Sequence, residues 1–129
     1  MEAGLRIQIH VSETKTEIEE CQEKYHMTPV KKLDELGVFR VPAIAAHGVY
    51  LEEADIEVLK QRNVSVAHCP VSNLKLGSGI ADIYKLMNSG VNVCLGTDGA
   101  ASNNNLNLFK EANIAALIAK GIHCNPTIV

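Results

Sequence analysis

Four short apolar segments recur along the chain, and each is followed by a side chain that can bind a metal or move a proton. The segments are residues 5–9, 41–46, 64–67 and 91–97. The side chains at their ends are His10, His47, His68 and Asp98. Continuous Val, Ile, Leu and Ala runs are typical of strands in a parallel sheet covered by helices. Because an ionisable group is costly inside such a run, we expect four strand ends that converge on one site.

Helical patterns fill the sequence between these apolar segments. Thr14 and Glu17 form a capping-box pattern that predicts a helix reaching about residue 25. A second helical segment follows Pro29 and should end at Gly37. Further helices are expected over residues 52–62, 80–89 and 106–120, the last ended by Gly121, with polar loops over 69–79 and 96–105. Strands that alternate with helices predict an α/β fold with right-handed crossovers and a parallel sheet.

Composition narrows the class of protein. The 129 residues are enough for one domain with a core, and 47% of them are hydrophobic, as in globular proteins. The net charge is −3 and no Lys/Arg cluster stands out, which argues against nucleic acid or an anionic membrane surface as a partner. No apolar stretch is long enough to span a bilayer, and the first residues do not resemble a signal peptide. The four cysteines show no Cys-x-x-Cys spacing, so we expect reduced thiols and a cytoplasmic location.

Two architectures fit four parallel β/α units. One is a small doubly wound sheet, and the other is half of an eight-stranded barrel, which normally needs about 250 residues. The polar strand ends favour the half barrel. The chain enters its first strand almost at once, and residues 121–129 resemble the start of another element. We therefore expect residues 1–129 to form a single partial domain, truncated at both ends.

The chemistry of each candidate residue is open when it is considered alone. His10-x-x-Glu13 could join a zinc ligand to an acid, or it could be a strand-end histidine followed by a helix N-terminal glutamate. His47 could be a base or a half-buried histidine with one backbone hydrogen bond. Asp98, between glycines, could ligate a metal or form an Asx turn. Ser102 could cap a turn or touch substrate.

Two further motifs give weaker evidence for a function. His68-Cys69-Pro70 suggests the zinc cytidine deaminases, but the P-C-x-x-C half of their signature is absent and that family is rejected. A structural role is therefore the better interpretation for His68. Gly77-x-Gly79 is a lone G-x-G and only a weak phosphate signal.

Taken together, these motifs resemble the second half of the amidohydrolase superfamily. The similarity is greatest to the 5′-methylthioadenosine/S-adenosylhomocysteine deaminases and related chlorohydrolases, and it covers nearly the whole chain. The motifs that carry it are His10-x-x-Glu13, His47, His68-Cys69-Pro70-x-Ser72-Asn73 and Gly96-Thr97-Asp98-Gly99-x-x-Ser102-Asn103. The resemblance implies strands five to eight of a (β/α)₈ barrel with one divalent metal, most often zinc and sometimes iron.

The resemblance also implies a role for each matching residue. His10 and Asp98 correspond to metal ligands, Glu13 to the acid/base that protonates the purine ring, and His47 to the histidine that assists the attacking water. Asp98 would also accept a proton from that water. Glu13, Asp98 and Ser102 would contact the substrate. The implied reaction is attack of a metal-activated water at C6 of an adenosine-type substrate, which yields the inosine counterpart and ammonia.

One departure from the family pattern limits these expectations. The family's His-x-His ligand pair does not occur in these 129 residues, so only two of four ligands are present. Alone, the chain should bind metal weakly and have little or no deaminase activity. Its exposed sheet edges and inner face favour self-association. The alternatives are a chlorohydrolase, a deaminase of another ring such as guanine or cytosine, and a non-catalytic half-barrel assembly module.

Overall fold

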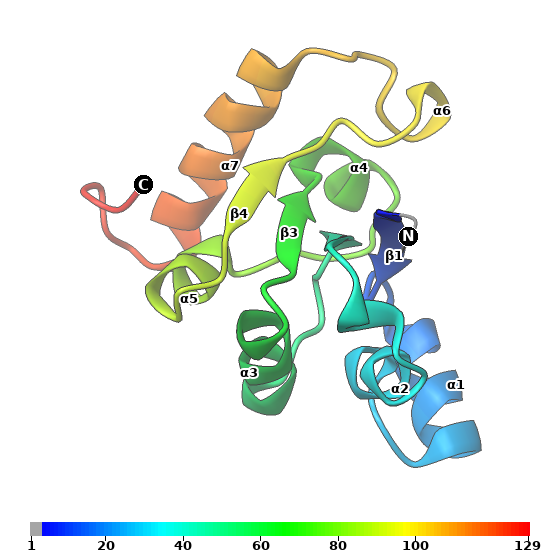
Figure 1. Ribbon diagram of the computed structural model, residues 1–129. Helices are drawn as coiled ribbons and strands as arrows, with labels where there is room; N and C mark the ends of the chain where they lie inside the picture. Colours follow the sequence, from blue (N-terminus) through cyan, green and yellow to red (C-terminus); the bar gives the residue numbers. More distant parts are fainter. Residues whose placement is uncertain (1–3) are drawn as a thin grey trace.

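Four parallel strands form the centre of the molecule. The computed structural model describes residues 4–129 and orders the strands β1-β2-β3-β4 (Figure 1). The strands are β1 (Ile7–Val11), β2 (Ala43–His47), β3 (Ser65–His68) and β4 (Val93–Leu95). Each pairs in parallel with the next along the chain. The predicted α/β class and parallel sheet are therefore confirmed.

The register of the sheet aligns the strand ends. His10 lies opposite Ala46, and Val11 lies opposite His47. At the other edge, His68 lies opposite Leu95. Because all four strands run in one direction, the residues that follow them emerge at the same side of the sheet. The strand-end groups predicted from the sequence therefore lie at one end of the molecule.

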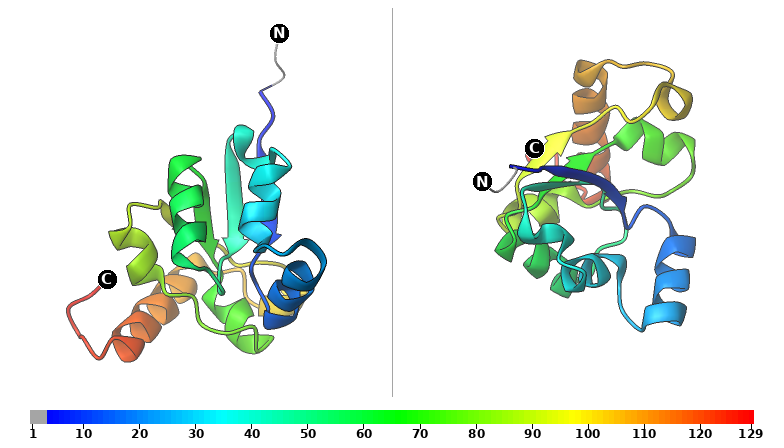
Figure 2. Two further views of the ribbon diagram at one scale, coloured as in Figure 1. Left: turned by 90° about the horizontal axis from the view of Figure 1, so that it is seen from below. Right: turned by 45° about the vertical axis from the view of Figure 1, so that its right-hand side comes forward.

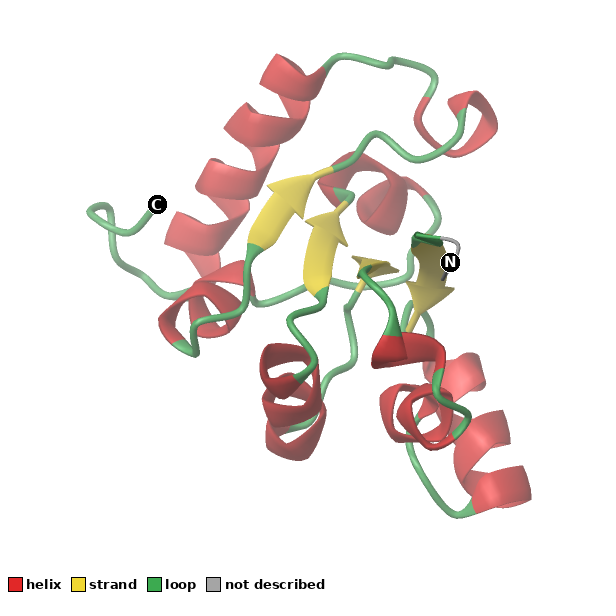
Figure 3. Ribbon diagram, viewed as in Figure 1, coloured by secondary structure: helices red, strands yellow, loops and turns green. Residues whose placement is uncertain are grey.

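Helices return the chain between strands, as the polar and apolar pattern predicted (Figure 3). The helices that lie in the segments predicted to be helical are α1 (Lys15–Tyr25), α2 (Pro29–Glu35), α3 (Glu53–Gln61), α5 (Ile83–Asn88) and α7 (Leu108–Ile122). Thr14 caps α1 by accepting a hydrogen bond from the Glu17 amide. The Glu17 carboxylate does not complete the box on Thr14; it accepts from the amides of Ser12 and Glu13, both at 2.7 Å. This helix start therefore also holds the turn that carries Glu13.

Three short elements and one helix end differ from the sequence expectation. The 3₁₀ helix η1 (Val38–Arg40) and the helices α4 (Pro70–Lys75) and α6 (Ala100–Asn103) lie in segments expected to be irregular. Each is too short to show a helical period. The long helix α7 also runs through Gly121, and His123 is its C-cap. Gly121 has no positive φ there, so it does not act as a helix stop.

Helices cover one face of the sheet (Figure 2). Val11, Ala45 and Val66 point from the strands into the main core, where they meet Ile56 and Leu59 of α3. The rest of this core is Val30, Phe39, Ala43, Val64, Leu86 and Val91, and a second cluster consists of Ile83, Ala115, Ala119 and Ile128. Neighbouring strand residues alternate between faces, so the opposite face carries Gln8, His10 and Ile44, which are exposed.

Within residues 4–129, none of the helices has the length and apolar character that crossing a membrane requires.

Core packing around α3 gives a stability prediction. Leu59 is fully buried, and its replacement by Ala should lower the free energy of unfolding by about 2–5 kcal/mol because it removes apolar contacts and leaves a cavity. Leu117→Ala is the matched control, since that side chain is 61% exposed on α7. Urea unfolding of both variants measures the difference. Equal losses for the two variants would contradict the assignment of the core.

Candidate active site at the strand ends

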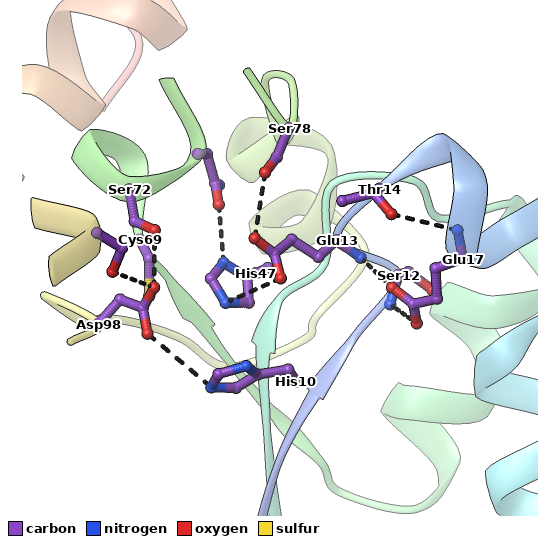
Figure 4. A network of polar contacts seen from close by, with 12 residues as sticks. His10, Ser12, Glu13, Thr14, Glu17, His47, Cys69, Ser72, Ser78 and Asp98 are labelled. Atoms are coloured by element: carbon purple, nitrogen blue, oxygen red, sulfur yellow. Dashed lines mark hydrogen bonds and ion pairs between the residues drawn. The ribbon is translucent and has the colours of Figure 1, made fainter. Parts of the chain in front are cut away.

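Four side chains from three strand ends converge at one edge of the sheet (Figure 4). His10 lies in β1 with Glu13 just after it, His47 ends β2, and Asp98 follows β4. His47 Nε2 lies 3.7 Å from Glu13 Oε2, and His10 Nε2 lies 3.9 Å from Asp98 Oδ1. The two imidazole rings meet edge to face with centroids 4.9 Å apart. The structure thus brings together all the candidate ligand and proton-transfer residues.

His47 is held in one orientation by Asn73. The ring is buried, and its Nδ1 lies 2.8 Å from the Asn73 amide oxygen, which is also buried. Because an amide oxygen can only accept, Nδ1 carries the hydrogen and Nε2 keeps its lone pair. That Nε2 is buried and has no hydrogen-bond partner among residues 4–129. An unpartnered ring nitrogen of His47 therefore faces Glu13.

Glu13 is held through its other carboxylate oxygen. Ser78 Oγ donates a hydrogen bond of 3.1 Å to Glu13 Oε1, which leaves Oε2 facing His47. Ser78 itself is fixed because its carbonyl accepts a 2.7 Å bond from Tyr50 Oη. The next residue must be glycine: Gly79 has φ +134°, and a Cβ there would lie 2.9 Å from Tyr50 Oη. The loop before α5 thus fits closely against Tyr50 and supports Glu13.

Asp98 is held between two short helices. Ser72 of α4 and Ser102 of α6 donate bonds of 2.7 and 2.6 Å to the same oxygen, Oδ2, and the other oxygen, Oδ1, faces His10. Partial burial alone would raise the pKa of Asp98, but the bonds from Ser102, Ser72 and the Gly99 amide outweigh it and lower the pKa to about 2. Asp98 is therefore a carboxylate throughout the neutral range. Ser102, expected to line the pocket, lies beside Asp98.

Two buried neighbours lie behind these groups. Burial, aided by nearby His47, lowers the pKa of His68 to about 4, so His68 is neutral near pH 7. Burial, followed by the charges of Asp98 and Glu111, raises the pKa of Cys69 to about 11, so its thiol stays protonated. The backbone at Gly96 passes close to this thiol, because a Cβ there would lie 2.9 Å from the Cys69 sulfur.

Sequence reasoning missed several supporting residues. Ser72 and Asn73 were part of the quoted motif, but their contacts to Asp98 and His47 could not be read from spacing. Glu111 was not singled out, although it is fully buried in α7. It accepts bonds from the Val71 amide and from Asn103 Nδ2, which also donates to the Thr97 carbonyl. The sequence did contain one sign of this role, since Glu111 is a single acidic residue on an otherwise apolar face of the helix.

The donor set fits a divalent transition metal. His10, Glu13 and His47 each offer one ligand atom, and these atoms lie within 4.8 Å of one another. Imidazole nitrogen and carboxylate oxygen are the ligands that zinc takes in catalytic sites. Of the residues at the site, His10 and Asp98 line a cleft of the uncovered sheet face, together with Leu106 and Leu108. A small polar ligand could therefore reach these atoms from solvent.

The profile of the amidohydrolase family matches residues 1–128. The chain belongs to this family. A relative from Thermococcus sibiricus named 5-methylthioadenosine/S-adenosylhomocysteine deaminase is 54% identical over 127 residues, which is 98% of this chain and 30% of the relative. The chain thus spans about a third of the length of the curated relatives that it matches.

Solved structures of amidohydrolases share the fold. A zinc-bound adenosine deaminase from Xanthomonas campestris superposes with a TM-score of 0.88 at 41% identity, covering 95% of this chain and 28% of that one. A guanine deaminase from C. acetobutylicum with bound guanine gives a TM-score of 0.88 at 29% identity, covering 96% and 31%. The amidohydrolase fold is therefore confirmed, with this chain corresponding to one part of it.

The contact between His47 and Asn73 predicts a tautomer. In a ¹⁵N-labelled sample at neutral pH, long-range ¹H–¹⁵N spectra should show His47 protonated at Nδ1. Asn73→Ala should populate the Nε2–H form, because the acceptor for Nδ1 is lost. Asn73→Asp keeps an acceptor and should retain the Nδ1–H form, as should the distant control Asn92→Ala. An Nε2–H tautomer in the unsubstituted protein would refute the arrangement.

Burial of His68 predicts a pH dependence of stability. Its pKa is about 4 when folded and 6.5 when unfolded, so the unfolded chain binds more protons between these values. The free energy of unfolding should therefore fall as pH drops from 6.5 to 4, by up to about 3 kcal/mol from this group. His68→Gln cannot take up the proton, and the difference between the two urea-unfolding curves isolates the effect. Parallel pH profiles would exclude it.

Proposed function

We propose that this chain provides the carboxyl-terminal half of the active site of a metal-dependent aminohydrolase that deaminates an adenosine-type nucleoside. Methylthioadenosine and S-adenosylhomocysteine are the substrates suggested by the name of the Thermococcus relative. The products would be the inosine counterpart and ammonia. The observation that carries the proposal is the convergence of Glu13, His47 and Asp98 at the strand ends, in a chain 54% identical to that relative.

Glu13 and His47 are suited to proton transfer at the purine ring. Glu13 Oε2 lies 3.7 Å from His47 Nε2, so a single water or substrate atom between them could contact both and pass a proton. The bond that Glu13 accepts from Ser78 and the bond that His47 donates to Asn73 keep both reactive atoms directed at the same space. In the proposed reaction, Glu13 delivers a proton to N1 of the ring while His47 orients the attacking water.

His10 and Asp98 are suited to hold a divalent metal, with zinc favoured by the imidazole and carboxylate donors. When bound, the metal would lower the pKa of a water molecule and so generate the nucleophile near neutral pH. The low pKa of Asp98 favours a ligand over a strong proton acceptor, because a carboxylate with pKa about 2 is a weak base. Ser102 holds Asp98 in place through its hydrogen bond to Oδ2. We propose this as the main role of Ser102, with contact to the substrate as an additional one.

Two further expectations belong to this proposal. β1 and β4 are the edge strands of an open sheet, and the uncovered face carries the exposed Ile44. Such edges favour pairing with further β/α units or with a second copy of the chain. We also propose a cytoplasmic location, in which the four cysteines would stay reduced; all four are free thiols in the described part of the chain.

A chimera tests the proposed reaction. This chain would replace the matching segment of the Thermococcus sibiricus relative, which supplies the remainder of the barrel, and release of ammonia from methylthioadenosine would be measured. We expect turnover by the chimera and none by the chain alone. Glu13→Gln in the chimera should lower kcat by at least about a hundredfold because the proton donor is lost.

The matched control is Glu20→Gln, which changes an exposed carboxylate of α1 and should leave kcat unaltered. A folded chimera that binds zinc but does not deaminate any adenosine-type nucleoside would contradict the proposal. So would full activity of the Glu13→Gln chimera.

A further inference from the structure

We propose that His10, Glu13 and His47 form a divalent transition-metal site that is complete within this chain and does not need the family's His-x-His pair. One ligand atom from each residue lies within 4.8 Å of the other two. Two imidazoles and one glutamate are a sufficient protein ligand set for zinc, with a further position left open. In this site Glu13 and His47 are ligands, whereas the proposed deaminase uses them for proton transfer.

The strongest evidence is the buried, unpaired nitrogen of His47. Its Nε2 has no hydrogen-bond partner among residues 4–129, although the side chain is only 1% exposed. A buried polar atom without a partner costs free energy. Because Nδ1 donates to Asn73, the free atom is the one with the lone pair, and it points at Glu13. A cation placed there would satisfy it.

The outer contacts resemble those that orient ligands around metals. His47 Nδ1 donates to the Asn73 amide oxygen, and Glu13 Oε1 accepts from Ser78 Oγ. Metal-binding histidines and carboxylates commonly make such a second bond, which sets the tautomer and the direction of the ligand atom. Two of the three donors are therefore already directed before any metal binds.

His10, the third donor, can move to complete the coordination geometry. Donors around a tetrahedral zinc lie about 3.3–3.6 Å apart, given bonds of about 2.0–2.2 Å. The pair from Glu13 and His47, at 3.7 Å, nearly meets this spacing. The ligand atom of His10 lies within 4.8 Å of the other two and can move closer by side-chain rotation, because this side chain is 62% exposed. The imidazole nitrogens favour zinc and similar ions over magnesium or calcium.

Zinc titration of the unmodified 129-residue chain tests the site. In calorimetry under reducing conditions we expect one zinc per chain. Glu13→Gln and His47→Ala should each weaken binding at least tenfold, and more than Asp98→Asn does. His26→Ala, which removes an exposed histidine at the end of α1, is the matched control and should bind as the unmodified chain does. Glu13→Gln retains the shape of the side chain and its acceptor for Ser78.

Nitrogen-15 spectra of the unmodified chain provide a measurement that needs no variant. Zinc should shift the Nε2 resonance of His47 together with a ring nitrogen of His10. The proposal is overturned if zinc does not bind, if His47 Nε2 is unaffected, or if only His10→Ala and Asp98→Asn weaken binding. The chimera assay is independent of this result, because it measures deamination in the presence of the missing ligands.

Discussion

Parallel pairing of the four strands is the constraint on which the rest of the structure depends. Because β1 to β4 run in one direction and pair in sequence order, the carboxyl ends of all four strands lie along the same side of the sheet. The register that sets Val11 opposite His47 brings the turn after β1 beside the end of β2. Glu13 can then reach His47 although 34 positions separate them in the sequence. A shift of one residue would turn His10 to the covered face and remove it from the cluster.

Residues in the segments that follow the strands hold the site side chains in fixed orientations. Glu13, His47 and Asp98 each have one polar atom bound from behind, by Ser78, Asn73 and Ser72 respectively, and one atom facing the site. Two of these residues have left-handed backbone conformations, with φ 74° at His47 and φ 57° at Asp98. Left-handed backbone in residues other than glycine costs free energy and concentrates at functional sites. The hydrogen bonds behind the site compensate part of that cost and hold the geometry.

The sequence predicted the strands, and the clustering of polar side chains at their ends, because both follow from local patterns. The apolar runs ending in His10, His47 and Asp98 define strand and strand end without reference to the rest of the fold. The helices α4 and α6 were not predicted, since they are short and lie in polar segments without an apolar helical period. The partners of the site residues were also missed. Ser78 lies 65 positions from Glu13, and a single hydroxyl carries no sign of the acceptor that it will meet.

His10, Glu13 and His47 take part in both the proposed deaminase and the proposed metal site. Whether Glu13 and His47 act as ligands or in proton transfer depends on how many other metal ligands are near. In the proposed deaminase, a His-x-His pair from another part of the barrel would leave His10 and Asp98 to complete the coordination of the metal, and Glu13 and His47 to handle protons. Without that pair, the carboxylates of Glu13 and Asp98 and the unpartnered nitrogen of His47 would still attract a cation to the strand ends. The direction of each donor atom comes from hydrogen bonds within this chain. Its use as a ligand or as an acid therefore depends on which residues lie on the opposite side of the cleft.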